Sequence, residues 1–101
     1  MVHHIVLWDL KEELKEEEKR EAAAAVKAKL EAVKDKVEGV ISLEVIIDGL
    51  PSGNKDIGLI SSFQSEEALN AYQVHPAHVE AVGYVKSVTC NRTCLDYNQP
   101  E

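Results

Sequence analysis

Residues 2–10, VHHIVLWDL, decide the fold. Successive side chains of a β-strand point to opposite faces. One face of this strand carries Val2, His4, Val6, Trp8 and Leu10. The other face carries His3, Ile5, Leu7 and Asp9. Because both faces hold large apolar side chains, the pattern predicts a strand that is covered on both sides.

The following segment, residues 12–37, has the pattern of one long helix. Its apolar residues recur at spacings of three and four, namely Ala22, Val26, Leu30, Val33 and Val37. The first turns are acidic and the last turn carries lysines, which is the charge order that the helix dipole favours. Gly39 follows and provides a helix stop. The glutamates and lysines form a solvated face rather than a binding tract.

Three more strands are predicted, over residues 40–48, 56–63 and 89–97. In residues 40–48, Ile41, Leu43, Val45 and Ile47 share one face, and Val40 and Ile46 leave apolar patches on the other. Residues 49–56, GLPSGNKD, form a loop rich in glycine and proline.

A second helical region, after residue 63, is broken by a proline. Ser65 is placed to cap a short helix that ends between residues 72 and 74. Pro76 interrupts it because proline lacks the N–H group and disfavours the helical conformation of the preceding residue. A further helix begins at Pro76, and we expect Val79, Val82 and Val85 to face inward.

The predicted order is β-α-β-β-α-β, the ferredoxin-like arrangement of the α+β class, in one domain over residues 1–101. Its four-stranded antiparallel sheet has helices on one face only. The sequence has no further helix to cover the other face. The apolar side chains of residues 2–10 nevertheless predict that this face is covered. We therefore expect a homodimer in which the open sheet faces of two copies meet.

Composition limits the possible partners. The 101 residues are 45% hydrophobic and 29% charged, with a formal net charge of −7. This charge repels phosphate backbones and acidic membrane surfaces, so no nucleic acid and no membrane is expected as a partner. No apolar run approaches the roughly 20 residues that span a bilayer. The N-terminus lacks the pattern of a signal peptide, so a cytoplasmic location is expected.

The two cysteines, Cys90 and Cys94, are four residues apart and would share one face of a regular strand. Their Cα atoms would then be about 13 Å apart, too far for a disulfide or a shared metal ion. They are expected to be small, half-buried core residues. No glycine-rich phosphate loop and no nucleophile-elbow serine is present, so no cofactor is predicted.

Three stretches carry a family resemblance: HHIVLWDLKEE near the N-terminus, DIGLISSFQSEEALNAYQVHPAHVEAV in the middle, and CLDY near the end. Together they resemble the stress-responsive A/B barrel (Dabb) family over nearly the whole chain. The resemblance implies a dimeric α+β barrel of ferredoxin-like protomers. Many members of this family have no known activity, and some plant members are heat-stable proteins that assemble further.

One enzymatic member type, olivetolic acid cyclase, closes a ring by intramolecular aldol condensation. The resemblance places its catalytic tyrosine and histidine on Tyr72 and His78, and a first-strand pocket histidine on His4. This chain differs at the third strand, where Ile57 replaces a pocket histidine. That difference weakens a direct transfer of the cyclase reaction.

The corner AYQVHPAH, residues 71–78, therefore has two interpretations. His78 and Tyr72 form a catalytic pair, in which the histidine exchanges a proton and the tyrosine polarises a carbonyl group, or they hydrogen-bond within the corner and hold its shape. His4, Trp8, Ile57 and His75 are the candidate ligand-binding residues. His75 and His78 are too few to define a metal site, and none is predicted.

Three functions follow from these residues. The first is an A/B barrel protein that binds a small apolar or carbonyl-bearing ligand in a cavity rimmed by His4, Tyr72 and His78. The second is a cofactor-independent cyclase or lyase that uses the Tyr/His pair. The third is a purely structural stress protein.

Overall fold

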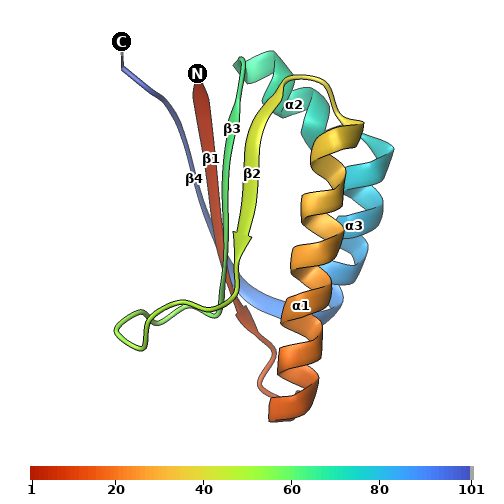
Figure 1. Ribbon diagram of the computed structural model, residues 1–101, viewed down its shortest axis with the longest axis vertical. Coiled ribbons are helices and arrows are strands. Elements are labelled where there is room, and N and C mark those ends of the chain that lie inside the picture. Colours follow the sequence, from red (N-terminus) through yellow and green to blue (C-terminus); the bar gives the residue numbers. More distant parts are fainter. Residues whose placement is uncertain (101) are drawn as a thin grey trace.

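The computed structural model describes residues 1–100 as a four-stranded antiparallel sheet with helices on one face (Figure 1). The elements in chain order are β1 (Val2–Leu10), α1 (Glu16–Val33), the 3₁₀ turn η1 (Lys34–Lys36), β2 (Val40–Ile46), β3 (Ile57–Phe63), α2 (Glu66–Val74), α3 (Pro76–Val88) and β4 (Thr89–Asn98). The strands lie in the order β2-β3-β1-β4. The predicted ferredoxin-like α+β fold is confirmed.

Strand β1 occupies the centre of the sheet between β3 and β4. Its side chains alternate between buried and half-buried along the whole strand. The buried side chains, those of Val2, His4, Val6, Trp8 and Leu10, face the helices. The half-buried ones face the opposite side, so this strand has the two apolar faces that its sequence predicts.

Helix α1 is shorter at both ends than the predicted segment 12–37. The chain first makes a turn in which the Leu14 N–H donates to the Lys11 carbonyl over 3.2 Å. The helix then begins at Glu16, where the Glu18 carboxylate accepts a hydrogen bond from the Lys15 N–H over 3.0 Å. At the other end, the last turn tightens into η1, as is common at helix termini.

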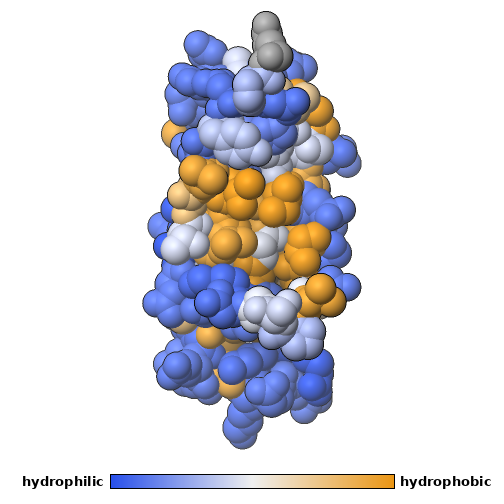
Figure 2. Space-filling model, turned by 90° about the vertical axis from the view of Figure 1, so that its left-hand side faces the viewer, coloured by the Kyte–Doolittle hydropathy of each residue, from blue (hydrophilic) through white to orange (hydrophobic). Residues whose placement is uncertain are grey.

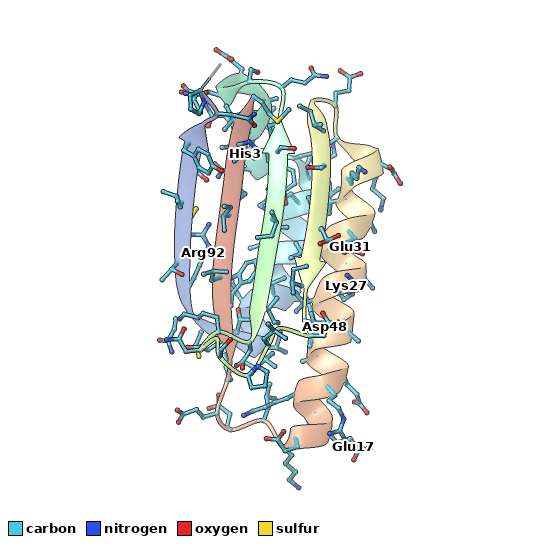
Figure 3. All side chains as sticks on the ribbon, turned by 60° about the vertical axis from the view of Figure 1, so that its left-hand side comes forward. His3, Glu17, Lys27, Glu31, Asp48 and Arg92 are labelled. Atoms are coloured by element: carbon cyan, nitrogen blue, oxygen red, sulfur yellow. The ribbon has the colours of Figure 1, made fainter. Side chains whose placement is uncertain are left out.

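Helix α1 also protects the outer edge of β2, which pairs only with β3. The Lys27 ammonium donates to the Val45 carbonyl over 2.6 Å, and the Glu31 carboxylate accepts from the Val45 N–H over 3.0 Å. This N–H, with the Lys27 ammonium, holds the pKa of Glu31 below its ordinary value. Figure 3 shows both side chains beside β2, with Arg92 on β4 at the opposite edge of the sheet.

Strand β2 carries a bulge that changes its predicted faces. Its pairing with β3 shifts between Val40 and Ser42, so Ile41 is the extra residue. Leu43 and Val45 are buried as expected, but Ile41 is 42% exposed. The expectation that Ile41 shares a face with Leu43 and Val45 was wrong, because strict alternation does not hold across a bulge.

The break between α2 and α3 lies where the proline predicts it. The Ser65 hydroxyl accepts a hydrogen bond from the Ala68 N–H over 3.1 Å and caps α2. Helix α3 then begins at Pro76. Val85 is buried as predicted, whereas Val79 is 56% exposed, so its expected inward position was wrong. Ala81 lies on the buried face of α3 instead.

The face of the sheet opposite the helices is uncovered. Figure 2 shows a band of hydrophobic side chains across the middle of this face, with hydrophilic side chains above and below it. Its most exposed members are Ile60 on β3, 44% exposed, and Leu95 on β4, 60% exposed. Within residues 1–100, no helix is both long and apolar enough to cross a membrane.

Candidate functional site

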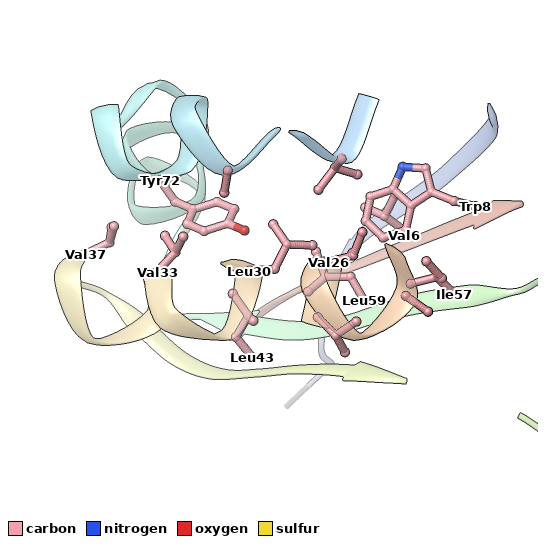
Figure 4. Packing of buried hydrophobic residues seen from close by; sticks show 14 of the residues in the cluster. Val6, Trp8, Val26, Leu30, Val33, Val37, Leu43, Ile57, Leu59 and Tyr72 are labelled. Carbon is pink, nitrogen blue, oxygen red and sulfur yellow. The ribbon is translucent and has the colours of Figure 1, made fainter. Parts of the chain in front are cut away.

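Tyr72 lies at one end of the helix-side core, in the last turn of α2, and its side chain has no exposed surface. Three aromatic rings surround it. Its ring centroid lies 5.0 Å from that of Phe63, 4.3 Å from that of His78 and 6.4 Å from that of His4. Figure 4 shows its hydroxyl pointing into the core toward Leu30. The structure thus brings together three of the predicted site residues.

The Tyr72 hydroxyl has no hydrogen-bond partner, although it is buried. Among residues 1–100 it is the only buried side-chain nitrogen or oxygen atom in this situation. Burial raises the pKa of Tyr72 to about 12, so the hydroxyl keeps its proton and can donate a hydrogen bond. An unpaired buried hydroxyl destabilises a fold by about 1–3 kcal/mol, so a hydroxyl at this position calls for an explanation other than stability.

His78 occupies the first turn of α3 and is half-buried. Its Nδ1 atom lies 3.0 Å from the Gln73 carbonyl oxygen. Because a carbonyl only accepts, Nδ1 carries the hydrogen and Nε2 keeps a free lone pair. Burial lowers the pKa of His78, and His4 and Arg92 add to this effect, while the Gln73 carbonyl opposes it. The ring is therefore a neutral base at pH 7, held in one tautomer.

His4 is 3% exposed and faces the helices from β1. In the register of β1 and β4, His4 lies directly opposite Asp96, and its Nδ1 atom forms a hydrogen bond with the Asp96 carboxylate. Cys94, two residues before Asp96, lies next to the pair, with its Sγ atom 3.7 Å from Nδ1 of His4. Burial and the neighbouring Asp96 carboxylate raise the pKa of the Cys94 thiol.

The sequence did not indicate Asp96 as a site residue, and it predicted the wrong face of β4 for Cys94 relative to Cys90. The pairing of β1 with β4 shifts between Leu7 and Asp9, and Asn91 adopts a φ of 54° at this point. The shift places Cys90 opposite Asp9, on the open face, and Cys94 opposite Val6, on the helix side. The expectation that the two cysteines share a face was therefore wrong, because β4 is not a regular strand. Both are free thiols.

Two of the predicted ligand-binding residues lie far from this corner. Trp8 and Ile57 are direct partners in the β1–β3 pairing, four residues further along β1 than His4. At about 3.3 Å per residue, this separation is about 13 Å. His75 has a local contact instead, because its Nδ1 atom accepts a hydrogen bond from the Ala77 N–H and caps α3.

A surface groove of about 240 Å³ adjoins the corner. It lies between α2 and the β1–β4 pair, and its lining includes Leu69 on α2 and Asp96 on β4. Asp96 therefore borders the groove and also contacts His4. A neutral base, a buried donor and an oriented imidazole lie close to one another, with Tyr72 between His4 and His78, and these groups suit proton transfer next to a carbonyl group.

The fold and this corner define a class of protein: ferredoxin-like protomers with one open sheet face and a Tyr/His corner beneath the helices. The family model described as "Stress responsive A/B Barrel Domain" (Dabb) matches residues 2–99, and the chain belongs to this family. A search among curated proteins gives no match.

Solved structures agree with this assignment. A dimeric protein of unknown function with a ferredoxin-like fold from Bacteroides fragilis is 31% identical, with 97% of this chain and 95% of that chain covered and a TM-score of 0.90. A Dabb family protein from Mesorhizobium loti is 22% identical (99% and 97% covered, TM-score 0.74). The hydroxynitrile lyase of Passiflora edulis shares the fold at 16% identity (99% and 94% covered, TM-score 0.80).

Proposed function

We propose that this chain forms a homodimer through its open sheet face, and that each protomer binds a small, partly apolar carbonyl compound beside Tyr72, His78 and His4. The Tyr/His pair then catalyses proton transfer without a cofactor. The single observation that supports the ligand site best is the buried Tyr72 hydroxyl, which lacks an acceptor. A carbonyl oxygen is the acceptor that would satisfy it.

The proposed reaction step uses atoms whose states follow from the geometry. The free Nε2 lone pair of His78 takes a proton from the carbon next to the carbonyl group, and that C–H bond breaks. Its electron pair forms a double bond to the carbonyl carbon, and the π electron pair of the carbonyl group moves to the oxygen, which becomes an enolate oxygen. The Tyr72 hydroxyl keeps its proton and donates a hydrogen bond to that oxygen. His4, which Asp96 orients, forms part of the wall of the site.

Access to this site requires a local movement. The Tyr72 hydroxyl has no exposed surface, whereas the neighbouring His78 side chain is half-buried and partly reaches solvent. The groove along Asp96 provides a path from solvent on the β4 side. We therefore propose that the ligand enters between α2 and β4, where a local movement of α2 would connect the groove to the Tyr72 hydroxyl.

Exchange of α-hydrogens tests the chemistry without knowledge of the natural substrate. Acetophenone is incubated in D₂O with the protein, and loss of its methyl proton signal is followed by NMR. We expect the wild type to exceed free imidazole at equal concentration. His78→Ala should lose about 10²–10⁴-fold in rate, and Tyr72→Phe about 10²–10³-fold. Tyr84→Phe is the matched control, because Tyr84 is half-buried on α3 beneath Lys29.

Two outcomes contradict the enzymatic part of the proposal. One is a wild-type rate no greater than that of imidazole, and the other is an equal rate in all variants. If the protein also sediments as an assembly much larger than a dimer, the purely structural role is favoured.

The dimer is supported by the apolar band on the open face and by the dimeric relative from Bacteroides fragilis. Sedimentation at micromolar concentration tests it. We expect a dimer for the wild type and a monomer for Leu95→Glu, because a charge would be buried at the interface. Val74→Glu, at a 76% exposed position on the helix side, should remain dimeric. A monomeric wild type would contradict the proposal.

We further propose that the chain folds as one domain and that it is located in the cytoplasm. Fractionation of cells would test the location.

A further inference from the structure

We propose that His4, Cys94 and Asp96 form a three-ligand site for a thiophilic divalent cation of the Zn²⁺ class. This site goes beyond the proposed function and does not depend on it. The donor atoms are Nδ1 of His4, Sγ of Cys94 and a carboxylate oxygen of Asp96, and all three lie within 4.8 Å of one another. Within residues 1–100 this is the one place where three such donors converge.

The spacing of the donors fits a tetrahedral ion. With ordinary zinc bond lengths of about 2.0–2.3 Å, neighbouring donors of a tetrahedral site lie about 3.4–3.6 Å apart. Here Sγ of Cys94 lies 3.5 Å from the Asp96 oxygen and 3.7 Å from Nδ1 of His4. Only the hydrogen-bonded pair, His4 and Asp96, is closer than the site requires. Loss of the shared proton and a small opening of this pair would complete the geometry.

The sheet holds the three ligands in place. Asp96 lies opposite His4 and Cys94 lies opposite Val6, so the three side chains project from two hydrogen-bonded strands on the same side. Ligands on paired strands need little reordering when an ion binds, which lowers the entropic cost of binding. This rigidity distinguishes the cluster from a group of carboxylates on mobile surface loops.

Burial and charge complete the argument. His4 is 3% exposed, while Cys94 and Asp96 are exposed on the edge strand β4. An ion can therefore enter from solvent, and its fourth position faces water, as in zinc sites with three protein ligands. The chain has a net charge of −7, which favours cations. Arg92 is an opposing positive charge close to Cys94, where it partly offsets the rise in the pKa of the thiol that burial and Asp96 cause.

The test is a titration of the reduced, metal-free full-length protein with Co²⁺, followed by displacement with Zn²⁺. A thiolate ligand to Co²⁺ gives a charge-transfer band in the near ultraviolet, which carboxylate and imidazole ligands do not give. We expect one Co²⁺ per chain with this band. Cys94→Ser should abolish the band and weaken Zn²⁺ binding at least about tenfold, because changes even to groups around zinc ligands weaken binding 10–100-fold.

The second cysteine provides the matched control. Cys90 lies on the opposite face and its Sγ atom contacts the Leu10 carbonyl, so Cys90→Ser should keep the band. His3→Ala controls for the neighbouring histidine, whose ring contacts Gln99. Arg92→Met should tighten Zn²⁺ binding. Absence of the band in the wild type, its survival in Cys94→Ser, or its loss in Cys90→Ser would overturn the proposal. Cys94 is exposed, so folding of Cys94→Ser is not at risk.

Discussion

The two ends of the helix-side core differ in what they bury. At one end, Trp8 and Ile57 pack within the hydrophobic cluster and, among residues 1–100, leave no buried polar side-chain atom without a partner. At the other end, the core contains Tyr72 and the half-buried His78, and it leaves the Tyr72 hydroxyl without a partner. Figure 4 shows Trp8 and Tyr72 at opposite ends of one cluster, with Val26 and Leu30 between them.

This difference predicts that the two ends of the core contribute differently to stability. An apolar end gains free energy with every buried group, at about 25 cal/mol per Å². At the polar end, the cost of burying an unsatisfied hydroxyl reduces the free energy that burial gains. A phenylalanine would fill the Tyr72 position without the penalty, so the fold alone does not explain the tyrosine. Truncating Ile57 at the apolar end and removing the Tyr72 hydroxyl at the polar end should therefore change stability in opposite directions.

The largest effect is expected at the apolar end. Ile57 is 1% exposed, and Ile57→Ala leaves a cavity opposite Trp8. Such truncations destabilise a fold by about 2–5 kcal/mol. Urea titration measures the loss. Val74→Ala, at a position that is 76% exposed, should change stability by less than about 0.5 kcal/mol. Equal effects of the two substitutions would mean that the apolar end is not tightly packed.

A second substitution tests whether the polar end is simply loose. Gly39 has a φ of +86°, and a Cβ atom there would lie 2.6 Å from Cβ of Ala68 on α2. Gly39→Ala should destabilise the fold by about 1–3 kcal/mol through backbone strain and this contact. Adding Ala68→Gly should restore the part that comes from the contact. If Gly39→Ala has no effect in urea titration, α2 is loosely held, and the unpaired hydroxyl of Tyr72 reflects poor packing.

The third substitution should have the opposite sign. Tyr72→Phe removes the unpaired hydroxyl and keeps the ring contacts with Phe63 and His78. We expect unchanged stability or a gain of up to about 1–3 kcal/mol. Tyr84→Phe, at a half-buried position, is the control and should have little effect. A clear loss of stability in Tyr72→Phe would show that the hydroxyl has a structural partner, and the corner would then be a structural joint.

The fold could be predicted from the sequence because its signals are local. Alternation in β1, the apolar stripe of α1 and the break at Pro76 each follow from backbone geometry and side-chain spacing. The errors in the strands occur at Ile41 and between Cys90 and Cys94, where bulges add a residue to one strand. A bulge depends on the partner strand, so a single strand pattern does not reveal it.

The candidate site could be predicted only in part, for the same reason. Tyr72 and His78 are six residues apart in one corner, and the alternation of β1 assigns His4 to the helix side. The contact between His4 and Asp96 joins residues far apart in the chain and depends on the register of β1 and β4. Trp8 shares the parity of His4 and so entered the prediction, because parity gives the face and not the distance along the strand.

The smallest expected effect is a pH dependence at the polar end. Burial, with His4 and Arg92, lowers the pKa of His78 below its ordinary value of 6.5, and the Gln73 carbonyl opposes this shift. The unfolded chain therefore binds more protons at this residue than the folded chain does. The contribution of His78 to the free energy of unfolding is therefore present above pH 6.5 and is lost as the pH falls from 6.5 toward the folded pKa.

His78→Asn keeps a donor for the Gln73 carbonyl but does not titrate. The stability of this variant should therefore fall less than that of the wild type between pH 7.5 and pH 5.5, as urea titrations at several pH values would measure. Parallel curves for the two proteins would mean that His78 is solvated like a surface histidine, and the polar end would then lose its candidate base.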